Sequence, residues 1–134
     1  MSDKEERLEH ANAMLVSISK YGRRFFHHDG RVTRLEFDKR GRVWCIDKYA
    51  GKRIYTHRTS MISRWKGFSD GGTLRALMEY ARDYVIHGKP IRGSLFGPWP
   101  EWVCGGDLWG YGKAEMQLLR DELASNPAVE AAEV

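Results

Sequence analysis

Cysteine is scarce in this sequence, and that excludes two common ways of holding a small fold together. The 134 residues include only Cys45 and Cys104, which are too few for a disulfide framework. No Cys-x-x-Cys pair and no zinc-ligand spacing occurs. The sequence therefore predicts a fold that depends on its hydrophobic core, with neither a cofactor nor a metal.

Long apolar runs are missing too. The charged stretch from Met1 to Arg7 is not followed by the apolar region of a signal peptide. No run approaches the roughly 20 apolar residues that a membrane-spanning helix needs. We therefore expect a cytoplasmic protein that does not bind membranes.

Positive charge is concentrated in one part of the chain. The net charge is +4, but residues 20–66 hold 14 Lys and Arg against 4 Asp and Glu. In residues 1–19 and 67–134 the acidic residues outnumber the basic ones. Such a bias indicates an anionic partner, such as nucleic acid or a nucleotide. The alternative is that the basic residues only line the solvent face of a sheet.

Three short segments are typical of β-strands: residues 31–37, 42–47 and 52–57. They are rich in Val, Ile and aromatic residues, and four-residue connectors that end in glycine separate them. Such connectors suit a type I turn followed by a left-handed residue. The turn signal Asp29-Gly30 adds residues 23–28 as a fourth strand. We predict a three- or four-stranded antiparallel meander.

Apolar residues at helical spacing predict three helices, over residues 3–19, 73–87 and 113–124. Ser2 or Asp3 caps the first helix, and Gly88 ends the second. The fold class is therefore α+β, a meander flanked by N-terminal, central and C-terminal helices. We expect a single domain over residues 1–127 and a disordered acidic tail over residues 128–134.

Alternation along the predicted strands divides their side chains between two faces. Four side chains are candidates for one basic, aromatic-dotted surface that binds the ligand: Arg34, Arg42, Arg53 and Tyr55. Whether they share a face depends on the strand register, which alternation alone does not fix.

The Gly71-Gly72 turn before the central helix is the second candidate binding element. A helix N-terminus offers unpaired amides, and glycines let a phosphate approach closely. Further donors stand around the turn: Arg64, Lys66, Ser69, Thr73 and Arg75. The turn matches neither a Walker loop nor a dinucleotide fingerprint. The alternative is a tight turn that requires glycine backbone angles.

Residues 91–112 form a glycine- and aromatic-rich segment that is too long for an ordinary connector. Trp99, Trp102 and Trp109 either cover one end of the sheet or anchor a partner. A bacterial protein is the partner expected for such an anchor.

A nuclease would need a base and, in a metal-dependent enzyme, carboxylate ligands. His27, His28 or His57 is a candidate base, and Asp38 or Asp47 is a candidate ligand. No spacing among them is diagnostic, so we assign no catalytic residue and no metal ligand.

Three motifs resemble small, functionally unassigned proteins of tailed phages and prophages, and the resemblance covers most of the chain. The motifs are RGRVWCIDKYAGKRIYTH over residues 40–57, GFSDGGTLR over residues 67–75 and FGPWPEWVCGGDLWGYG over residues 96–112. The resemblance implies a phage accessory protein that acts in the host bacterial cytoplasm, against host defence or host regulation. It implies no particular catalytic or binding residues.

The sequence thus predicts a non-enzymatic binding protein for a phosphate-bearing ligand, either nucleic acid or a nucleotide. Two alternatives stay open. One is an inhibitor that docks on a bacterial host or defence protein through the Trp-rich segment. The other is a small nuclease or phosphodiesterase.

Overall fold

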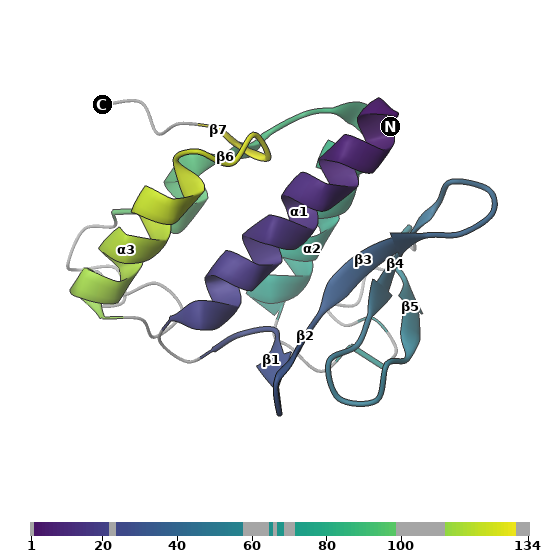
Figure 1. The fold of residues 1–134 in the computed structure, drawn as a ribbon, viewed down its shortest axis with the longest axis horizontal. Helices are drawn as coiled ribbons and strands as arrows, with labels where there is room; N and C mark the ends of the chain where they lie inside the picture. The colour runs from purple at the N-terminus through teal and green to yellow at the C-terminus, as the bar shows by residue number, and fades with distance from the viewer. Residues whose placement is uncertain are drawn as a thin grey trace.

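A computed structural model describes residues 2–21, 24–57, 65, 67–68, 72–98 and 112–130. Its elements in chain order are α1 (Asp3–Lys20), β1 (His27–His28), β2 (Arg31–Val32), β3 (Arg34–Phe37), β4 (Val43–Ile46), β5 (Arg53–Tyr55), α2 (Gly72–His87), β6 (Ile91–Arg92), the 3-10 helix η1 (Gly93–Phe96), α3 (Lys113–Leu123) and β7 (Val129–Glu130). In Figure 1, α1 and α2 stand between the β3–β5 sheet on one side and α3 with β6 and β7 on the other. The α+β class predicted from the sequence is confirmed.

The three helices lie where their periodicity predicted them. The Oγ atom of Ser2 caps α1, because it accepts the backbone N–H of Glu5 at 3.2 Å. Gly88 has a φ of 76° and donates its N–H to the carbonyl of Tyr84 at 2.8 Å, which ends α2. Within the described parts of the chain, the helices are too short or too polar to cross a membrane.

The meander is a three-stranded antiparallel sheet in the order β3-β4-β5. Leu35 pairs with Cys45, and Cys45 pairs with Ile54, so these three apolar residues share the buried face. The fourth strand instead forms a separate two-stranded hairpin, β1 with β2. The two sheets part after Thr33, whose N–H bonds to the carbonyl of Phe26 at 2.8 Å and so extends the pairing of β1 with β2 by one residue.

The structure describes the chain to Glu130, beyond residue 127, at which the sequence predicts the domain to end. β7 pairs in parallel with β6, and Ile91 donates its N–H to the carbonyl of Ala128 at 2.7 Å. The side chain of Ala128 is fully buried. On the same side of the molecule, Arg120 of α3 donates Nη1–H to the carbonyl of Phe96 at 3.0 Å. A two-residue strand in a small, acidic segment leaves no hydrophobic pattern to detect, so the sequence did not predict β7.

α1 is the element around which the others pack. It contacts α2, α3, β2 and β3, and its inner face is fully buried. One apolar cluster contains residues of α1, the sheet, α2 and α3, among them Leu15, Cys45, Leu77 and Leu119. The sheet and the three helices therefore share a single core.

Asn12 of α1 bonds to the backbone of the edge strand β3. Its Oδ1 atom accepts the N–H of Leu35 at 2.7 Å, and its Nδ2 donates to the carbonyl of Leu35 at 3.0 Å. An edge strand leaves such groups unpaired on its outer side. The amide of Asn12 therefore takes the place of a further strand at this position.

We predict that Asn12→Ala lowers the free energy of unfolding by about 1–3 kcal/mol, because it leaves a partly buried N–H and carbonyl without partners. Urea denaturation measures the loss. Glu9→Ala, at an exposed position of the same helix, is the matched control and should change stability little. Equal stability of the two variants would contradict the assigned role of Asn12.

Candidate functional site

One face of the β3–β5 sheet points away from the core. Arg34 pairs with Ile46 and Ile46 with Arg53, while Glu36 pairs with Trp44 and Trp44 with Tyr55. Paired residues of adjacent strands lie on the same face. We call this surface the outer sheet face; it consists of Arg34, Glu36, Asp38, Arg42, Trp44, Ile46, Arg53, Tyr55 and His57. The register therefore brings together the four side chains predicted from the strands.

Two arginines of the outer sheet face lie over aromatic rings. The guanidinium carbon of Arg53 is 4.6 Å from the centre of the Trp44 ring, and that of Arg42 is 5.3 Å from the centre of the Tyr55 ring. The two rings are themselves 4.9 Å apart. These distances are within the range of cation–π attraction. The result is a compact array of two cations and two rings on a sheet surface.

Asp38 organises this array from the β3–β4 turn. Its Oδ2 accepts the Nε1–H of Trp44 at 2.9 Å and the Nε–H of Arg42 at 3.1 Å. Its Oδ1 accepts the backbone N–H groups of Arg40 and Arg42. The bond from Trp44, with those from Arg42 and Arg40, holds the pKa of Asp38 well below its ordinary value. Asp38 thus fixes the ring of Trp44 and neutralises part of the charge of Arg42.

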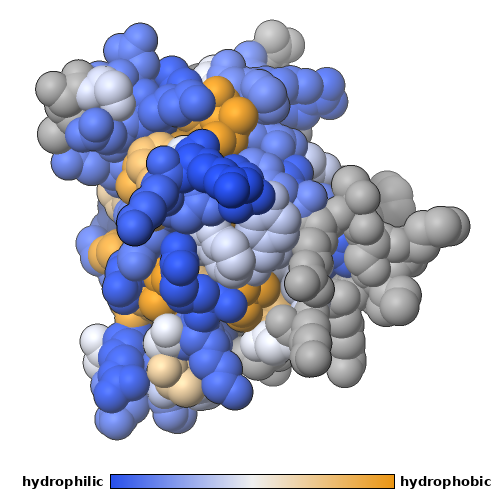
Figure 2. Space-filling model, turned by 90° about the vertical axis from the view of Figure 1, so that its right-hand side faces the viewer, coloured by the Kyte–Doolittle hydropathy of each residue, from blue (hydrophilic) through white to orange (hydrophobic). Residues whose placement is uncertain are grey.

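Arg53 and Arg34 carry the more available charge. Arg53 is exposed, and no ion pair joins it to another residue in the described part of the chain. Arg34 is 3.6 Å from Glu36, but its side chain is 58% exposed, and such a surface pair is weak. A shallow hollow of about 480 Å³ lies beside Arg53 and is lined by Phe37, Asp38, Lys39, Arg40 and Arg42 as well. Figure 2 views this side of the molecule, where hydrophilic side chains surround a paler patch.

Three of the candidate nuclease residues, Asp38, Asp47 and His57, have structural hydrogen bonds in this fold. Asp47 accepts the backbone N–H groups of Tyr49 and Ala50, each at 3.0 Å, in the β4–β5 turn. The Nε2 atom of His57 accepts the N–H of Val43 at 3.0 Å, and burial lowers the pKa of His57. Among the described residues, no group of three or more His, Cys, Asp or Glu side chains is placed to hold a metal ion.

The turn before α2 is only partly described. α2 begins at Gly72, and Thr73 is exposed in its first turn. Arg75 packs inward, with its Nη2 atom 2.8 Å from Oε1 of Glu79 and its guanidinium 5.2 Å from the centre of the Trp65 ring. The structure thus does not bring Arg75 to the outer sheet face. The remaining predicted site residues lie outside the described residues: Arg64, Lys66, Ser69, Gly71, Trp99, Trp102 and Trp109.

Sequence reasoning omitted Trp44 and Asp38 from the candidate site. A signal for Trp44 was present, because Arg42 and Trp44 are two residues apart, as are Arg53 and Tyr55 on the next strand. When the register aligns two such pairs on neighbouring strands, the arginine of one strand lies beside the aromatic ring of the other. Asp38 gave no such signal, since its bonds depend on the geometry of the turn.

We predict that Asp38→Asn lowers the melting temperature at pH 7 and that its deficit shrinks toward about pH 2. The fold lowers the pKa of Asp38 from its ordinary 3.8, so the carboxylate stabilises the fold above about pH 4 and this stabilisation is lost as the pH falls. Thermal melts at both pH values test this. The control Asp121→Asn, at an exposed position of α3, should melt like the parent at both. A deficit that does not change with pH would contradict the prediction.

Comparison with known proteins gives one match. The family model described as YoqU matches residues 2–125. No curated protein and no solved structure matches the chain. Because the matched residues span most of the sequence and include the helices and the sheet described above, the chain belongs to the YoqU family.

Proposed function

We propose that this protein binds nucleic acid through the outer sheet face. The observation that carries the proposal is the array of Arg53 on Trp44 and Arg42 on Tyr55. Arginines neutralise phosphates and release counterions, while aromatic rings and guanidinium planes stack on bases. A surface that combines both groups within a few ångströms suits a single strand, whose bases are free to stack.

The three arginines have different roles in this proposal. Arg53 and Arg34 contact phosphates, because their charge is exposed and little neutralised. Arg42 is held by Asp38 and reaches the hydroxyl of Tyr55 at 3.4 Å, so it mainly positions the Tyr55 ring. The excess of basic residues in residues 20–66 adds a long-range attraction for the polyanion.

The start of α2 is the second part of the proposal. Gly71, Gly72 and Thr73 offer a helix N-terminus to a phosphate, with Arg64, Lys66 and Ser69 as further donors. We also propose that the protein is of phage or prophage origin and acts in a bacterial cytoplasm, on the strength of the three motifs that resemble such proteins.

We predict that Arg53→Ala weakens binding to a fluorescently labelled single-stranded oligonucleotide and lowers the slope of log affinity against log salt by about 1. Fluorescence anisotropy over a salt series measures both. Lys113→Ala removes the same charge from an exposed position of α3, on the far side of the helices from the sheet in Figure 1, and should bind like the parent.

No binding at low salt, or an unchanged slope in Arg53→Ala, would rule out the outer sheet face as a nucleic-acid surface. Tight binding that ignores salt would point instead to a protein partner or an uncharged ligand.

The aromatic part of the site has its own test. Trp44→Phe and Trp44→Leu both lose the hydrogen bond to Asp38, but only Trp44→Phe keeps a ring. We expect Trp44→Leu to bind the oligonucleotide more weakly than Trp44→Phe, by up to about 1–3 kcal/mol for a lost stacking contact. Melting temperatures of both variants control for folding. Equal affinities would exclude stacking on Trp44.

A further inference from the structure

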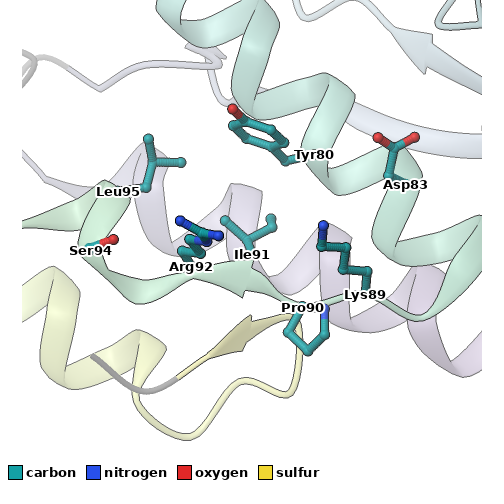
Figure 3. Close-up of a pocket in the computed structure, with 8 residues that line it drawn as sticks. All are labelled: Tyr80, Asp83, Lys89, Pro90, Ile91, Arg92, Ser94 and Leu95. Atoms are coloured by element: carbon teal, nitrogen blue, oxygen red, sulfur yellow. The ribbon is translucent and has the colours of Figure 1, made fainter. Parts of the chain in front are cut away.

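A second site lies between α2 and β6 and shares no residue with the outer sheet face. A cavity of about 450 Å³ opens there, lined by side chains of α2, β6 and η1 and by the short connector between α2 and β6 (Figure 3). Its volume falls within the range of about 300–1,000 Å³ that small-molecule sites occupy. We call it the α2–β6 pocket.

The pocket contains hydrogen-bond donors that the fold does not use. The side chains of Tyr80, Lys89 and Arg92 line it, and none of them takes part in a hydrogen bond or an ion pair within the described part of the chain. Lys and Arg have donors but no acceptor. A ligand that satisfies them must therefore supply acceptor atoms, and two cations favour acceptors with negative charge.

The charge of the pocket is positive on balance. Asp83 is the one carboxylate among the described residues that line it, and Nε of Arg82 donates to that carboxylate at 3.0 Å. Lys89 and Arg92 are exposed and therefore available to a ligand in solution. An anion entering the pocket would meet two cations and one carboxylate, which is paired with Arg82.

The apolar walls restrict the shape of the ligand. Ile91 and Leu95 line the pocket, and the ring of Tyr80, which is 50% exposed, lies above Ile91 and the guanidinium of Arg92 in Figure 3. An exposed aromatic ring in a pocket with apolar walls suits a flat group that packs against the ring. Lys89 and Arg92 line the same pocket.

We propose that the α2–β6 pocket binds a small organic anion, a phosphate or carboxylate carried on a flat aromatic or heteroaromatic ring. The planar guanidinium of Arg92 holds the anion, Lys89 adds a second charge, and the ring of the ligand stacks on Tyr80. The proposal is independent of nucleic-acid binding at the outer sheet face.

Titration of the full-length, nitrogen-15-labelled protein with adenosine 5′-monophosphate, adenosine, benzoate and inorganic phosphate tests the proposal. Adenosine 5′-monophosphate or benzoate should bind saturably and shift amides in the second half of α2 and in β6. Adenosine and inorganic phosphate, which lack the charge or the ring, should bind at least about tenfold more weakly. The comparison of nucleotide with benzoate identifies which source of the ringed anion the pocket prefers.

Variants at exposed positions test the residues. Arg92→Gln and Tyr80→Leu should each weaken the preferred anion by about tenfold, whereas Tyr80→Phe, which keeps the ring, and Lys113→Gln, outside the pocket, should bind like the parent. Arg53→Ala should leave binding of the ringed anion unchanged, and Arg92→Gln should leave oligonucleotide binding unchanged. The proposal for each site can therefore be confirmed or refuted independently of the other. No saturable binding of either ringed anion at millimolar concentration, or an unchanged affinity in Arg92→Gln, would overturn the proposal.

Discussion

The pair of hydrogen bonds between Asn12 and the backbone of Leu35 sets the sheet against α1. Leu35 is in register with Cys45 and Ile54, so fixing this one residue determines which side of the sheet meets the core. A slip of one residue would reverse the two faces and bury the arginines. α1 also bonds to α2, because Arg7 donates to the carbonyls of Val85 and Ile86. The orientation of the outer sheet face therefore depends on Asn12, a polar residue of α1 that is not part of this face.

Local patterns in the sequence predicted most of the helices and strands but not the contacts between them. Helical spacing and alternation act over a few residues, and they placed α1, α2, α3 and the meander correctly. Alternation also assigned Arg53 and Tyr55 to the face opposite the core, yet alignment with Arg42 needed the register. Asn12 and Leu35 are 23 residues apart in the chain, and no periodic signal records a bond over that distance. The strand β7 is too short to leave a pattern at all.

On the outer sheet face, the contacts that hold side chains in fixed positions also cancel part of the positive charge. Asp38 orients Trp44 and Arg42, but its carboxylate also cancels part of the positive potential next to them. The two rings, which are tilted against each other, would hold their positions less well without it, since the N–H of a half-buried indole has few other partners. The charge of Arg53 is not cancelled in this way, because its guanidinium is held by the Trp44 ring and not by a carboxylate. Arg53 is thus held in position while its positive charge stays available to a ligand.

The bond between Arg120 and Phe96 joins two points that stand on either side of residues 99–111. The pairing of β6 with β7 reinforces the same junction. Described residues of the domain therefore hold the chain together just before and just after this segment.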